Sequence, residues 1–92
     1  MFKGWMEIFK KLPDNHYLST EFNCPECGDK AIDYLYVVDE ITGIGYLPIW
    51  CNTCKQGIQL SRVGAPKGAK KINISDTSSI KENIPNFKQV EE

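Results

Sequence analysis

The sequence predicts a small α+β protein, in which an N-terminal amphipathic helix precedes an antiparallel sheet of three to four strands and a flexible C-terminal tail. Three observations predict this class: helical spacing of apolar residues near the N-terminus, strand-like segments in the middle, and a polar, Gly- and Lys-containing composition beyond residue 63. A chain of 92 residues accommodates one small domain. The expected boundaries are 1–15 for the helix, 20–63 for the sheet and 64–92 for the tail.

The composition excludes several classes of protein. Hydrophobic residues make up 41% of the chain and charged residues 25%, which argues against a wholly disordered, collagen-like or coiled-coil chain. No run of about 18 apolar residues occurs, and the N-terminus lacks the apolar stretch and cleavage site of a secretory signal. We therefore expect a cytoplasmic protein and no membrane association.

The N-terminal segment is amphipathic. At about 100° per residue, one half of the helical wheel collects the apolar side chains Phe2, Trp5, Met6, Ile8, Phe9 and Leu12, and Pro13 ends the helix. This face can pack on the chain's own sheet, on a partner protein or on a membrane surface. We favour packing on the sheet, because a small sheet by itself buries little apolar surface. A partner would instead use Phe2, Trp5, Met6 and Phe9, and the few lysines of the polar face disfavour a membrane.

The four cysteines form two CxxC pairs, CPEC at 24–27 and CNTC at 51–54, with 23 residues between them. Each pair brings two sulfurs to one side of a tight turn, and the connection is long enough for a hairpin to bring the turns together. Two disulfides would require an exported protein, but the sequence lacks an export signal. A redox-active cysteine pair would require a βαβ setting, which this strand-rich sequence does not provide. The spacing therefore favours a metal site with the ligands Cys24, Cys27, Cys51 and Cys54.

The metal expected in this site is one structural Zn²⁺. Four soft thiolates in a closed tetrahedral arrangement suit zinc, whereas iron accepts the same ligands and is the less favoured alternative. His16 could replace a cysteine ligand, but four cysteines make this unnecessary.

The first turn with its following residue, CPECG (24–28, the first knuckle), contains a proline and a glycine that favour the turn. The second, CNTCK (51–55, the second knuckle), has Asn52 and Lys55 instead, so we expect it to be looser.

Over residues 22–60 the two knuckles and the connecting hairpin resemble the zinc-ribbon class, with its rubredoxin-like arrangement. The resemblance implies an antiparallel β ribbon stapled by a structural metal. Residues 31–38, 46–50 and 57–63 have the composition of strands, and residues 21–23 could pair with one of them. Pro48 has no amide hydrogen, so we expect its strand to lie at an edge or next to a bulge.

No catalytic motif occurs, and four thiolates leave no open coordination position for water, so we do not expect an enzyme. We expect a non-catalytic zinc-ribbon protein that acts through interaction with another, unidentified protein. One alternative is a nucleic-acid or transcription-complex accessory. Residues 61–92 carry six basic and four acidic side chains, and the basic cluster would be Arg62, Lys67, Lys70 and Lys71. The other alternative is a rubredoxin-like iron electron carrier.

Overall fold

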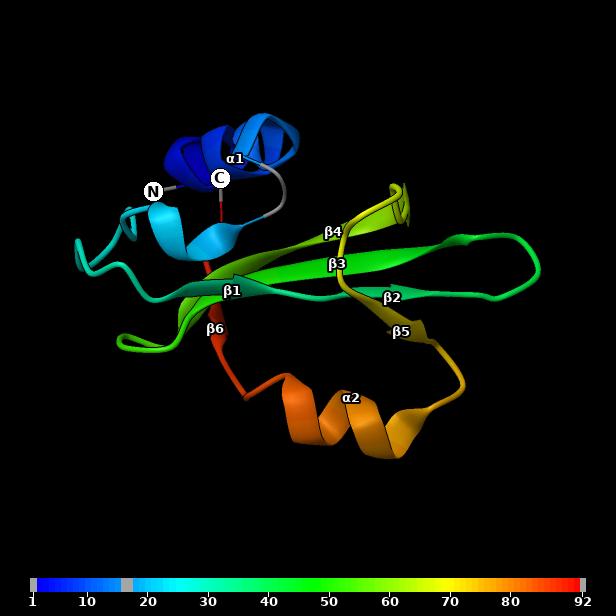
Figure 1. Ribbon diagram of the computed structural model, residues 1–92. Coiled ribbons are helices and arrows are strands. Elements are labelled where there is room, and N and C mark those ends of the chain that lie inside the picture. Colours follow the sequence, from blue (N-terminus) through cyan, green and yellow to red (C-terminus); the bar gives the residue numbers. More distant parts are fainter. Residues whose placement is uncertain (1, 16–17, 92) are drawn as a thin grey trace.

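The computed structural model describes residues 2–15 and 18–91 and arranges them in three layers (Figure 1). Helix α1 covers one face of a sheet, and helix α2 crosses the other face. The elements are α1 (Phe2–Lys11), two 3-10 turns (Pro13–Asn15 and Ser19–Glu21), β1 (Ile32–Tyr34), β2 (Tyr36–Val38), β3 (Ile44–Cys51), β4 (Gln56–Gly64), β5 (Lys71–Asn73), α2 (Thr77–Asn83) and β6 (Lys88–Gln89). In the described ranges, neither helix combines the length and apolar character that crossing a membrane requires.

The sheet is mixed and has six strands among the described residues, in the order β5-β2-β3-β4-β6, with β1 paired to β3. The pairs that β3 forms with β1, β2 and β4 are antiparallel, as expected. Strand β5 is parallel to β2, and β6 is parallel to β4. The prediction of a purely antiparallel ribbon of three to four strands is therefore wrong in both strand number and direction, because two short edge strands come from the segment beyond residue 63.

The segment 64–92, predicted to be a largely flexible tail, contains β5, α2 and β6. Backbone hydrogen bonds attach it at both edges of the sheet: the Ile74 N–H donates to Val38 O (2.9 Å), and the Val90 N–H donates to Gly57 O (2.7 Å). These strands are only two or three residues long, and their stability comes from pairing with β2 and β4 rather than from a local apolar pattern. The mobility of this segment stays a prediction.

Pro48 explains why the strand expected over 31–38 is divided into β1 and β2. It lies in the middle of β3, opposite Gln59 of β4, and its carbonyl accepts the N–H of Leu35 (3.3 Å). Since the N and O of a strand residue face the same neighbour, the missing N–H of Pro48 also faces Leu35, where the ladder is interrupted. Strand β3 pairs with β1 and β2 on one side and with β4 on the other, so it is central rather than at an edge. The expected bulge lies between Gly45 and Tyr46.

The core lies between α1 and the sheet. Trp5 is 0% exposed, and it forms one buried cluster with other large side chains: Ile8, Leu12, Ile32, Tyr34, Leu47, Ile49 and Ile58. Phe2, Met6 and Phe9 are partly buried against the same cluster. The apolar face of α1 is thus covered by the chain's own sheet, which is the arrangement that the sequence favoured.

Candidate metal centre

The four cysteine sulfurs lie together where the two knuckles meet, and all of them are within 4.8 Å of one another. The distance between the Sγ atoms is 3.7 Å for Cys24 and Cys54, and 3.6 Å for Cys27 and Cys51. A tetrahedral zinc ion with Zn–S bonds of about 2.3 Å separates its sulfurs by about 3.8 Å. The donor set therefore fits one tetrahedral metal ion, and the cysteines predicted from their spacing are the residues that converge.

The first knuckle directs peptide N–H groups at sulfur. The N–H groups of Glu26 and Cys27 lie 3.3 and 3.5 Å from the Sγ of Cys24, and the Gly28 N–H donates to the Cys24 carbonyl at 2.9 Å. Gly28 has a φ of 83°, a left-handed conformation that costs glycine no steric strain. Such N–H groups stabilise the negative charge of a thiolate.

The second knuckle makes the same turn without the same residues. The Lys55 N–H donates to the Cys51 carbonyl at 3.0 Å, and Lys55 has a φ of 56° at the position that corresponds to Gly28. Asn52 stands in place of the proline. Its backbone N–H donates to Ala31 O (2.9 Å), and its side-chain oxygen accepts the Trp50 Nε1–H (2.9 Å). These two hydrogen bonds attach the knuckle to its surroundings, and its expected looseness stays a prediction.

Replacing Lys55 by glycine should stabilise the metal-loaded protein. A non-glycine residue in the left-handed region costs about 1–2 kcal/mol, and the greater freedom of glycine in the unfolded chain offsets part of the gain. A net stabilisation of about 0.5–1 kcal/mol is expected in chemical denaturation. Lys55→Ala is the matched control, because it removes the same charge but keeps the unfavourable φ. An equal gain from alanine would contradict this explanation.

The thiols differ in acidity in the metal-free cluster. Burial raises the pKa of Cys51, but the backbone N–H groups of Cys54 and Thr53 and the neighbouring thiols outweigh it, so that the pKa is lowered to about 7. Burial and the hydrogen bond with Cys24 raise the pKa of Cys54 to about 12. The pKa of Cys27 is lowered by the Asp29 N–H, but desolvation and the thiols of Cys51 and Cys24 give a net increase. A divalent cation must therefore displace protons on binding.

Helix α1 packs directly on the first knuckle. The Trp5 Nε1–H donates to the Glu26 carboxylate at 3.1 Å, and a Cβ added to Gly4 would lie 2.8 Å from the Cβ of Pro25. Neither contact could be predicted from the sequence, because the partners are far apart in the chain and neither pair forms a recognised motif. The helix therefore supports the metal centre as well as the core.

The C-terminal segment packs on the second knuckle. The Lys88 N–H donates to Lys55 O at 2.9 Å. The ring of Phe87 stacks on Trp50, next to Cys51, with a centroid distance of 6.1 Å and an interplanar angle of 19°. The two knuckles thus join four parts of the chain: α1, the strand that starts at Ile32, the β3–β4 hairpin and the segment that ends in β6.

Replacing Gly4 by alanine should destabilise the protein. Alanine normally stabilises a helix by about 1 kcal/mol relative to glycine, but here the added methyl group overlaps Pro25. Overpacking of this kind costs about 1–3 kcal/mol, so the net effect should be destabilising and the melting temperature should fall. A double-mutant cycle with Pro25→Gly checks the cause, since the two changes should couple. A gain in stability from Gly4→Ala alone would show that α1 does not lie against this knuckle.

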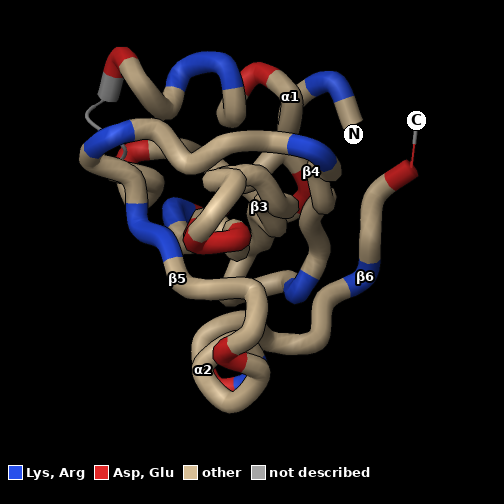
Figure 2. Tube along the Cα trace, turned by 90° about the vertical axis from the view of Figure 1, so that its right-hand side faces the viewer, with Lys and Arg blue, Asp and Glu red and all other residues tan. Residues whose placement is uncertain are grey.

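One of the basic residues proposed for nucleic-acid binding, Lys70, already has partners within the chain. Lys70 forms an ion pair with Asp33 and lies 5.0 Å from the centre of the Tyr34 ring, and Arg62 has a φ of 56° beside the bulge of the β3–β4 pair. Lys67 and Lys71 are exposed. Figure 2 shows basic segments spread over the trace, with acidic segments among them.

His16, the substitute metal ligand considered above, lies outside the described residues.

A scan against protein-family models found no match for this chain, and searches of curated proteins and of solved structures also found none.

Proposed function

We propose that the chain is a non-catalytic zinc protein, in which one Zn²⁺ bound by Cys24, Cys27, Cys51 and Cys54 has a structural role. The observation that carries this proposal is the convergence of four sulfurs at tetrahedral spacing, with backbone N–H groups directed at them. Four thiolates complete a tetrahedral coordination shell and leave no position for a substrate or a water nucleophile. The zinc would crosslink the two knuckles and so hold α1 and the C-terminal segment in place.

Metal analysis tests this proposal. Protein purified without added metal should contain one zinc per chain by mass spectrometry under native conditions, and Cys51→Ser should lose it. Cysteine thiols of the metal-free, unfolded chain have a pKa of about 8.5 and are mostly protonated at pH 7, whereas a bound metal requires thiolates. Zinc added to metal-free protein in weak buffer should therefore release at least two protons, and acidification should reverse the binding. One iron per chain and a red protein would favour the electron carrier instead.

The proposed activity is binding of another protein at the end of the sheet remote from the cysteines. Ile41 and Ile44 at the β2–β3 turn are 94% and 53% exposed, and Ile74 after β5 is 39% exposed. Ile44 begins β3 and Cys51 ends it, so Ile44 lies about 23 Å from Cys51 at about 3.3 Å per residue. The turn itself is held by Asp39, which accepts the N–H of Ile41 at 2.7 Å. Exposed apolar side chains on an ordered turn favour a protein contact.

The surface formed by Ile41, Ile44 and Ile74 can be tested without disturbing the metal centre. Ile41→Ser with Ile44→Ser should leave zinc content and melting temperature unchanged and should abolish specific crosslinks to the partner in extracts of the source cells. Leu18→Ser, which alters another exposed apolar residue, should not affect them. Crosslinks that persist in the isoleucine variant, or that disappear with nuclease or at high salt, would place the interaction elsewhere or favour nucleic acid.

A further inference from the structure

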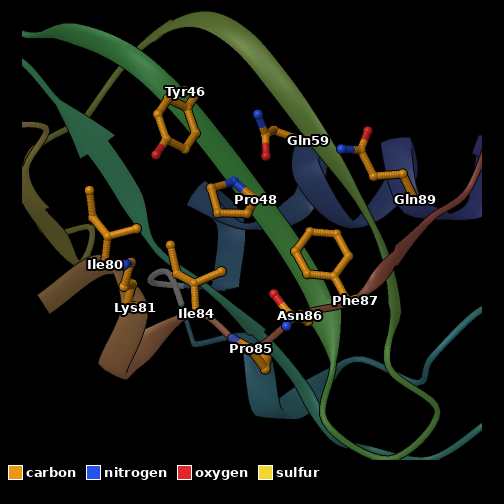
Figure 3. Close-up of a pocket in the computed structure, with 10 residues that line it drawn as sticks. All are labelled: Tyr46, Pro48, Gln59, Ile80, Lys81, Ile84, Pro85, Asn86, Phe87 and Gln89. Atoms are coloured by element: carbon orange, nitrogen blue, oxygen red, sulfur yellow. The ribbon is translucent and has the colours of Figure 1, made fainter. Parts of the chain in front are cut away.

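A hollow of about 620 Å³ lies on the sheet face opposite α1, between β3 and β4 on one side and the segment 80–89 on the other (Figure 3). Its existence follows from how this segment is attached. Strands β5 and β6 are the two outer strands of the sheet order, so the chain between them must cross the whole face. Helix α2 lies in that crossing and has no fully buried residue. The segment is therefore anchored at its two ends and leaves space beneath it.

The walls of the hollow are partly apolar. Tyr46 and Pro48 project from β3, Ile80 and Ile84 reach toward them from α2 and the residue after it, and the Phe87 ring lies beside Pro48 (Figure 3). Phe87 is fixed in turn by its stacking on Trp50. Two aromatic side chains, a proline and two branched aliphatic side chains give surfaces suited to a flat apolar group.

Besides the Tyr46 hydroxyl, the polar side-chain groups at the hollow are three neutral amides and one cation: Gln59, Asn86, Gln89 and Lys81. No hydrogen bond or ion pair involves any of these four side chains in the described part of the chain, and no carboxylate is among the described residues that line the hollow. An anion would therefore meet one lysine and several amide donors without a repelling charge. The volume is within the range of about 300–1,000 Å³ that is typical of small-molecule sites.

We propose that this hollow binds a small organic anion with a flat apolar body, with its ring between Tyr46 and Phe87 and its charged group at Lys81. This site is separate from the zinc-bound cysteines and does not depend on the proposed protein interaction. It does share one element with the metal centre, because Trp50 precedes Cys51 and supports Phe87. Binding should therefore require the folded, metal-loaded protein.

The probe for the test is 8-anilinonaphthalene-1-sulfonate, a flat aromatic compound with one sulfonate, titrated into the zinc-loaded full chain. Saturable binding of one probe per chain is expected, with amide shift changes in NMR spectra confined to β3, β4 and residues 80–89. Lys81→Glu should weaken binding about tenfold or more, since a hydrogen bond to a charged group is lost. Lys67→Glu is the matched control, because it changes the net charge equally and Lys67 does not line the hollow. N-phenyl-1-naphthylamine lacks the sulfonate. It should bind the unaltered protein more weakly than the sulfonated probe does, and it should bind the Lys81 variant as tightly as it binds the unaltered protein.

A second variant tests the apolar wall: Ile84→Trp should fill the hollow and displace the probe while zinc content is retained. Equal weakening by the Lys81 and Lys67 substitutions would overturn the proposal, because it would reveal only general attraction to a charged protein. Binding that increases after chelation would also overturn it, since the probe would then be reporting apolar surface exposed by loss of the native packing. Shift changes at the turn around Ile41 instead of residues 80–89 would place the apolar site elsewhere.

Discussion

Replacing Cys51 by serine, or removing the proposed zinc with a chelator, should unfold the chain as a whole. Structural zinc sites have apparent binding free energies of the order of 10 kcal/mol, comparable to the entire free energy of unfolding of a small domain, about 5–15 kcal/mol. Cys51 is fully buried. Its knuckle holds Trp50 and, through Lys55, the C-terminal strand β6. The loss should therefore spread beyond the site itself.

The near-ultraviolet circular dichroism of the two tryptophans provides the measurement. Trp5 reports on the first knuckle through Glu26, and Trp50 reports on the second through Asn52. Both signals should collapse together on chelation and should recover when zinc is added. Thr53→Ala, in the same turn but without a metal ligand, should keep zinc and both signals. A native spectrum in protein shown to contain no metal would mean that the apolar core alone holds the fold.

Replacing Trp5 by alanine should cause the largest loss of stability among substitutions outside the cysteines. Trp5 is 0% exposed in the core between α1 and the sheet, and truncation of a fully buried Trp or Phe to alanine costs about 3–5 kcal/mol. The change also leaves the Glu26 carboxylate without the indole N–H. In the zinc-loaded protein the denaturation midpoint should fall sharply, and metal release to a competing chelator should become faster.

Two further variants separate packing from the hydrogen bond. Trp5→Phe keeps most of the apolar volume and removes the indole donor, so its cost should be only a part of that of alanine. Glu7→Ala, on the exposed face of the same helix, should change stability by no more than about 0.5 kcal/mol. An unchanged midpoint for Trp5→Ala would contradict the packing of α1 on the sheet, and the face of Phe2, Trp5, Met6 and Phe9 would again be the candidate for a partner.

Local patterns in the sequence were sufficient to predict the elements that depend on neighbouring residues. The apolar spacing of 2–12 corresponds to α1, and the β-rich segments correspond to β1 with β2, to β3 and to β4. The spacing of the cysteines predicted their convergence. In each case the controlling interactions are short in sequence or are set by a ligand motif, so residue type and spacing carry the information.

The sequence by itself therefore determined the helix, the central hairpin and the four sulfur donors. Only the tertiary structure decided the parallel strands β5 and β6, because their two or three residues have no pattern of their own and are stabilised by the edges of β2 and β4. It also decided which groups support the knuckles, since Trp5 meets Glu26 and Phe87 meets Trp50 only after the chain has folded. The hollow beneath α2 has the same origin: it exists because the segment between β5 and β6 must cross the sheet face, a consequence of topology that no local spacing of residues encodes.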